Sequence, residues 1–124
     1  MIRSLNVKLW ILGYVYMDNK NVIIVMKIMA YIDKIDLYIA NVDKSAFLSD
    51  TKLIEACVFN LLQIGELANR VGENFQHTHP DIPWHKMRGL RNRLVHDYEG
   101  VNLELVWDVV KSDLETLRKQ LANI

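Results

Sequence analysis

The segment 91–98 (RNRLVHDY) holds the side chains of this chain that are best suited to chemistry. It groups a guanidinium at Arg91, an imidazole at His96 and a phenol at Tyr98. Arginine keeps its charge at physiological pH and can hold a phosphate through paired N–H donors. Histidine can move protons near neutral pH. Together Arg91 and His96 could cleave RNA without a metal ion, with the ribose 2′-hydroxyl as the nucleophile.

Each residue of this segment can be given a role in such a cleavage. His96 would act as the general base on the 2′-hydroxyl or as the acid toward the leaving 5′-oxygen. Arg91 would hold the scissile phosphate and stabilise its developing charge. Asn92 could hydrogen-bond the phosphate or orient His96, and Tyr98 could stack on a base or bond a phosphate.

The stretch between His85 and His96 is locally basic, although the whole chain has a formal net charge of zero. Its cations are Lys86, Arg88, Arg91 and Arg93, and no acidic residue lies among them. A patch of about +4 can hold a few phosphates, so Arg88 and Arg93 are further candidates for substrate binding. The alternative is a solvated helix face with cations near a helix C-terminus.

Helical geometry constrains how these residues can meet. A helix turns by about 100° per residue, so Arg91 and Tyr98 would lie within about 20° of each other on a continuous helix. His96 would point about 140° away from Arg91. Either the helix ends near Val95 and the next residues fold back, or a second copy of the chain completes the site.

The composition predicts one all-α domain. At 124 residues the chain has the length of a single domain, and 51% of its residues are hydrophobic. Cys57 is the one cysteine, which favours a packed core thiol and a reducing, cytoplasmic location. Residues 1–16 contain an apolar run too short to span a bilayer, and no membrane association is expected. We interpret them as an appended segment of strand-like composition, with the domain at 17–124.

Apolar residues recur at steps of three and four from residue 19 onward, which predicts helices. The first runs from about residue 19, and residues 41–49 are expected to form a loop. Asp50 or Thr51 can cap the second helix. Two prolines interrupt the pattern over 77–83, and a third helix is expected from Pro83 to Leu94 or Val95. Asn102 can cap the last helix, so short connections predict an antiparallel up-down four-helix bundle.

The second helix carries an unusually wide apolar surface. One stripe contains Leu53, Cys57, Asn60, Ile64, Leu67 and Val71, and a second contains Val58, Leu61, Leu62 and Gly65. One bundle core does not need both stripes, so the second is expected to meet another protomer in a homodimer. Asn60 is interpreted as a buried structural residue. Glu66 either pairs with Arg91 or Arg93 or is exposed to solvent.

Two segments carry a family resemblance. Residues 82–98 (IPWHKMRGLRNRLVHDY) resemble the Arg-x4-His-x-Tyr signature of HepT-like toxins of the HEPN superfamily, and residues 60–66 (NLLQIGE) resemble that family's second-helix signature. The resemblance implies a dimeric, metal-independent endoribonuclease that is the toxin of a toxin–antitoxin pair. It also implies an MntA-type minimal nucleotidyltransferase as antitoxin, which transfers AMP from ATP to Tyr98.

Two other functions remain open from the sequence. The chain could be a non-catalytic module that presents a nucleotide or substrate to a nucleotidyltransferase, or a structural bundle whose basic helix is only a solvated surface. No cofactor is expected, because a phosphate-cradling glycine loop is missing. No metal site is expected either, since His77 and His79 have no acidic or cysteine cluster beside them.

Overall fold

The computed structural model describes the backbone of residues 2–97 and 103–124 and the side chains of residues 19–94 and 103–124. The described residues form helices and connecting turns, without a strand. In chain order the elements are α1 (Ile2–Ile39), α2 (Lys44–Leu48), α3 (Thr51–Ala68), α4 (Glu73–Thr78), α5 (Trp84–Asp97), α6 (Leu103–Asp108), the π-helical turn η1 (Val109–Asp113) and α7 (Leu114–Ala122). The expected all-α fold is confirmed.

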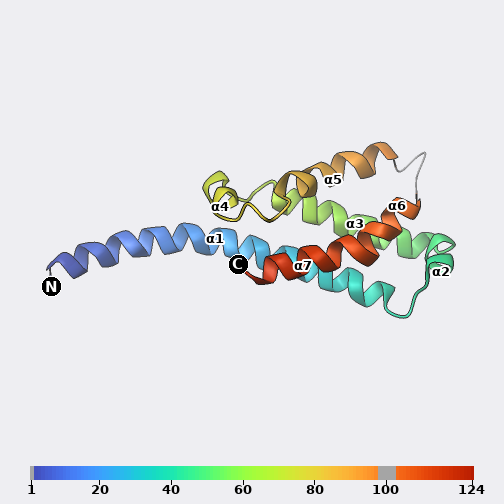
Figure 1. Ribbon diagram of the computed structural model, residues 1–124, viewed down its shortest axis with the longest axis horizontal. Helices are drawn as coiled ribbons and strands as arrows, with labels where there is room; N and C mark the ends of the chain where they lie inside the picture. The colour runs from blue at the N-terminus through green and yellow to red at the C-terminus, as the bar shows by residue number, and fades with distance from the viewer. Residues whose placement is uncertain (1, 98–102) are drawn as a thin grey trace.

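The long helices alternate in direction, as Figure 1 shows for α1, α3, α5 and the final run α6–η1–α7. The expected antiparallel up-down arrangement is therefore present. Helix α3 packs against α1 on one side and α5 on the other, and α7 and η1 also contact α1. A bidentate ion pair joins α1 to α7, because Nε and Nη2 of Arg118 lie 2.6 Å and 3.1 Å from the Asp33 carboxylate oxygens.

Both stripes of α3 are buried inside the chain. Leu61 is fully buried, Val58 and Gly65 are buried, and Leu62 is half-buried. The prediction that the second stripe faces another protomer is wrong, because α3 is the central helix and needs two apolar faces to contact both α1 and α5. Dimerisation itself stays a prediction.

Aspartate side chains cap the N-termini of α2 and α3. Asp50 accepts a hydrogen bond from the Leu53 backbone N–H at 3.1 Å, which confirms the expected cap of α3. Asp43 does the same for α2 from the Ala46 N–H at 2.8 Å. The prediction of a plain loop over 41–49 is wrong at α2, because burial of Phe47 fixes that turn.

The N-terminal part of the chain is helical, contrary to its strand-like composition. Helix α1 begins at Ile2 and continues without a break to Ile39. Adding a residue to an existing helix forms one hydrogen bond per residue fixed, whereas a strand needs a partner strand. The local β-propensity of residues 2–16 therefore does not determine their backbone conformation. That residues 1–16 lie outside the domain proper stays a prediction.

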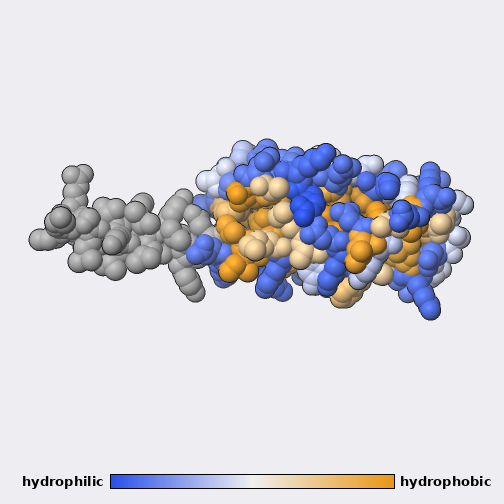
Figure 2. Space-filling model, turned by 90° about the horizontal axis from the view of Figure 1, so that it is seen from below, coloured by the Kyte–Doolittle hydropathy of each residue, from blue (hydrophilic) through white to orange (hydrophobic). Residues whose placement is uncertain are grey.

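Apolar surface remains on the outside of the bundle in places. The exposed large apolar residues of the described part are Ile23, Met26, Leu37, Tyr38 and Phe59. Figure 2 shows apolar surface bordered by polar side chains on one face. Within the described part of the chain, none of the helices combines the length and the apolar composition that crossing a membrane requires.

Candidate functional site

Helix α5 positions the candidate residues by burying its apolar side. Trp84, Met87 and Leu94 are buried. The helix begins after Pro83, whose carbonyl accepts a hydrogen bond from the Met87 N–H at 3.0 Å. It continues to Asp97, so the prediction that it ends near Val95 is wrong.

Helices α3 and α5 approach each other closely at Gly65. A Cβ atom at this position would lie 3.2 Å from the Met87 carbonyl oxygen and 3.6 Å from the Arg91 Cβ. A contact of 3.2 Å is tighter than most real Cβ contacts, so the absence of a side chain lets the helices meet. The close approach brings Glu66, the next residue of α3, within reach of Arg91.

Glu66 forms an ion pair with Arg91 across this helix contact. The Arg91 Nη1 lies 3.0 Å from the Glu66 Oε1, and the two side chains are 60% and 39% exposed. This contact decides between the alternatives left open for Glu66. A guanidinium has five N–H donors, so Arg91 can be held by Glu66 and still present donors to a phosphate.

The pair borders a polar pocket of about 280 Å³ between α3 and α5. Its lining residues are Gly65, Glu66, Asn69, His85, Arg88, Gly89, Arg91 and Asn92. The structure therefore brings together three candidates for contact with RNA, Arg88, Arg91 and Asn92. Arg88 is fixed from α4, because its Nη1 donates to the Gln76 Oε1 at 2.6 Å.

The remaining cations of the basic stretch lie on another side of α5. Arg93 and Lys86 line a different pocket with Asp113 of η1 and Leu117 of α7. The basic patch expected from the sequence is thus divided between two pockets. A role for Arg93 in substrate binding stays a prediction.

Sequence reasoning missed His85 and Asn69 as lining residues of the Arg91 pocket. Helical spacing could have found His85, because His85, Arg88 and Asn92 recur at steps of three and four along one helix face. Asn69 follows the end of α3, and its place depends on how α3 and α5 pack. No spacing rule within one helix could have assigned it.

A family profile described as "Ribonuclease HepT-like" matches residues 28–124. The chain belongs to the HepT-like ribonuclease family. The match includes α3, α5 and the Arg91 pocket between them.

Three relatives illustrate the similarity of this HepT-like chain. An RNase candidate of Caldanaerobacter subterraneus subsp. tengcongensis is 33% identical over 63% of this chain and 70% of its own length. A Thermococcus cleftensis protein named "Probable ribonuclease HepT" is 35% identical over 63% and 71%. An RNase candidate of Methanocaldococcus jannaschii is 34% identical over 65% and 74%. A comparison with solved structures gave no significant match.

Two motif residues of the HepT-like signature lie beyond the described side chains. The backbone of His96 belongs to α5, but its side chain lies outside the described residues, as does the whole of Tyr98. Because positions 91 and 96 share one continuous helix, they are rotated by about 140° from each other. One copy of α5 therefore does not turn both positions toward the same phosphate.

Other polar residues near the HepT-like motifs have structural roles. Asn60 is 4% exposed and donates from its Nδ2 to the Ala56 carbonyl at 2.7 Å, which satisfies its amide within α3. Cys57 is fully buried, and burial raises the pKa of its thiol to about 11. The described residues contain no cluster of three His, Cys, Asp or Glu residues that could hold a metal ion.

Proposed function

We propose that this HepT-like chain is an RNase toxin that cuts RNA internally and needs no metal ion. The proposed catalytic residues are Arg91 and His96. The observation that carries the proposal is the Arg91 guanidinium, which Glu66 holds at 3.0 Å beside a polar pocket. Arg88 and Asn92 line the same pocket and would hold the RNA backbone next to the scissile phosphate.

The cleavage is an internal phosphoryl transfer. His96 takes the proton of the ribose 2′-hydroxyl, and the 2′-oxygen attacks the adjacent phosphorus. The bond from phosphorus to the 5′-oxygen breaks, this oxygen takes a proton from water, and His96 returns its own proton to the solvent. The products carry a 2′,3′-cyclic phosphate and a 5′-hydroxyl. Arg91 stabilises the charge that develops on the phosphoryl oxygens.

A homodimer belongs to this proposal. Positions 91 and 96 lie about 140° apart on the continuous helix α5. Two copies with their α5 helices face to face would supply an Arg91 and a His96 from different chains to one phosphate. In this dimer the second chain completes the site, so the residues after Val95 do not have to fold back toward Arg91.

RNA cleavage in EDTA tests the mechanism. We expect cleavage to persist in chelator and to leave 2′,3′-cyclic phosphate ends. His96→Ala should lower the rate by about 10² to 10⁴, the usual contribution of a general acid or base. His77→Ala, which removes an exposed imidazole on α4, is the matched control and should cleave normally. Strict Mg²⁺ dependence, or products with 5′-phosphate and 3′-hydroxyl ends, would contradict the mechanism.

Control by a nucleotidyltransferase antitoxin is the second part of the proposal. Its support is the position of Tyr98 in the Arg-x4-His-x-Tyr signature, two residues after His96. The Tyr98 hydroxyl oxygen attacks the α-phosphate of ATP, pyrophosphate leaves, and AMP remains on the ring. The added phosphodiester repels an RNA phosphate by like charge, and the nucleoside occupies space at the site.

Intact-mass measurement tests this modification. After incubation with the antitoxin and ATP, the wild-type chain should gain the mass of AMP and lose its ribonuclease activity. Tyr98→Phe should gain no mass, because it has no hydroxyl to modify. Tyr31→Phe is the matched control and should be modified like the wild type. Addition of AMP to Tyr98→Phe, or none to the wild type, would contradict the assignment.

A further inference from the structure

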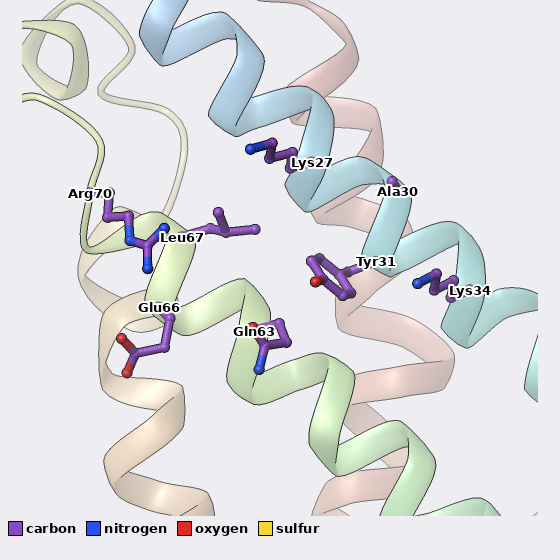
Figure 3. A pocket seen from close by; sticks show the side chains of 8 residues that line it. All are labelled: Lys27, Ala30, Tyr31, Lys34, Gln63, Glu66, Leu67 and Arg70. Atoms are coloured by element: carbon purple, nitrogen blue, oxygen red, sulfur yellow. The ribbon is translucent and has the colours of Figure 1, made fainter.

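Another pocket lies on the opposite side of α3 from α5. It has a volume of about 400 Å³ and opens between α1 and α3 (Figure 3). We call it the α1–α3 groove; its lining residues are Lys27, Ala30, Tyr31, Lys34, Gln63, Glu66, Leu67 and Arg70. This volume lies within the range of about 300 to 1,000 Å³ that is typical of ligand sites.

The groove concentrates positive charge on a chain of zero net charge. Lys27 and Lys34 come from α1 and Arg70 comes from α3, as Figure 3 shows. The one carboxylate in the lining, Glu66, is already paired with Arg91. Lys27 and Arg70 have no ion pair with another described residue, so their charges are available to an anion.

The groove lysines of α1 and its carboxylates Asp33 and Asp36 lie on different sides of the helix. Asp33 lies between the two groove lysines in sequence but pairs with Arg118 of α7 at 2.6 Å. Burial and the nearby Asp33 carboxylate raise the pKa of Asp36, and Arg118 opposes that rise, which places Asp36 on the α7 side as well. Asp33 and Asp36, the α1 carboxylates with described side chains, therefore do not neutralise the groove.

The groove also offers aromatic rings. Tyr31 points from α1 into the space between the helices (Figure 3), and the Lys34 ammonium lies 5.1 Å from its ring centroid. Tyr38 and Phe59 are 40% and 58% exposed. They lie one helical turn beyond Lys34 on α1 and Gln63 on α3, so they continue the same faces. Cations interleaved with exposed rings are typical of surfaces that bind single-stranded nucleic acid.

The α1–α3 groove is continuous with the Arg91 pocket. Glu66 lines both, and α3 is the ridge between them. The cations lie at separated points, with Lys27 and Lys34 about 10 Å apart along α1 at 1.5 Å per residue. Charges spaced in this way suit a chain of phosphates better than a single small anion.

We propose that the α1–α3 groove binds single-stranded RNA next to the cleavage site. Lys27, Lys34 and Arg70 contact phosphates, and a base stacks at Tyr31. The strand passes over α3 at Glu66, which places one of its phosphates at Arg91. This inference rests on the proposed ribonuclease function and extends it from one phosphate to a length of strand.

Binding measured without cleavage tests the groove. The probe is a fluorescein-labelled single-stranded RNA of about 12 nucleotides, within the site sizes usual for such surfaces. It is titrated at several salt concentrations with the full chain carrying His96→Ala, so that the RNA stays intact. Adding Lys27→Gln, Lys34→Gln and Arg70→Gln should reduce the slope of log affinity against log salt by about 2, at about 0.7 per phosphate contact.

The matched control removes the same charge elsewhere. Lys52→Gln, Lys111→Gln and Lys119→Gln replace exposed lysines outside the groove lining. This control should keep the affinity and the salt slope of the parent. Tyr31→Leu should weaken binding about tenfold with little change in the salt slope, because it removes stacking and no charge.

Two outcomes would overturn the inference. One is equal RNA affinity and salt slope for the groove and control variants. The other is sedimentation in which only the groove variant loses a subunit, because the groove would then be a protein interface. A failure of the ribonuclease proposal can be distinguished from a failure of this inference. In that case the groove variants would still bind RNA less well than the parent, but the wild-type chain would not cleave RNA.

Discussion

Arg91, which we propose binds the scissile phosphate, has one fixed neighbour in the structure. Its guanidinium is 60% exposed, yet it has a fixed partner in Glu66 at 3.0 Å. An exposed ion pair contributes only about 0–1 kcal/mol to stability. We therefore expect the pair to affect the orientation of Arg91 more than the stability of the fold.

Glu66→Gln tests this effect. We expect kcat for RNA cleavage to fall about tenfold with little change in KM, because a mobile Arg91 stabilises the transition state less well. The melting temperature should stay close to that of the wild type. Both parameters come from steady-state cleavage of a defined RNA.

Glu115→Gln is the matched control, since it breaks another exposed ion pair, with Lys119 at 3.4 Å on α7. It should leave kcat unchanged. Equal losses of kcat in the two variants, or none in either, would mean that Glu66 does not position Arg91.

At the scale of elements, the contact between α3 and α5 sets the geometry of the Arg91 pocket. Gly65 lies in that contact, with the Met87 carbonyl oxygen 3.2 Å from where a Cβ would stand. Gly89 lies on α5, and a Cβ added there would meet nothing within 4 Å. The two glycines therefore differ in packing while sharing the weak helix propensity of glycine.

Alanine substitutions at these glycines should have different effects on the free energy of unfolding. Gly89→Ala should raise it by about 1 kcal/mol through helix propensity alone. Gly65→Ala gains the same helix propensity, but the added methyl group overpacks the helix contact, which costs about 1–3 kcal/mol. It should therefore be neutral or destabilising. Urea unfolding of both variants measures the difference. Equal stabilisation by the two would show that α3 and α5 separate easily.

At the scale of the whole molecule, the proposed site needs two chains. The second apolar stripe of α3 is buried within the protomer, so it is not the dimer surface. Helix α5 runs on through position 96, so positions 91 and 96 are rotated by about 140° from each other on one helix. A dimer formed around the α5 helices is the assembly that fits both observations.

Sedimentation equilibrium should therefore give a mass near twice 14.5 kDa at micromolar concentration. Cleavage per chain should fall on dilution below the dissociation constant of the dimer, because a monomer cannot complete the site. A monomeric protein that cleaves RNA at a rate independent of its concentration would contradict the dimer.

The sequence by itself determined the local features of this protein. The three-four spacing of apolar residues predicted α1 from residue 19 onward, α3, α5 and the C-terminal helical run, and Asp50 marked the start of α3. Residues 82–98 and 60–66 predicted the family. Each of these signals lies within one helix or one short segment, where backbone hydrogen bonding and side-chain period act over a few residues.

The tertiary structure decided which helix faces meet. In the folded chain Glu66 pairs with Arg91, and both stripes of α3 are buried. The cations of the basic patch line two different pockets. The tertiary structure also brought Lys27 and Arg70 to one groove, although they are far apart in the sequence. Helical period gives the direction of each side chain, but the neighbour it meets depends on long-range packing, which no single segment encodes.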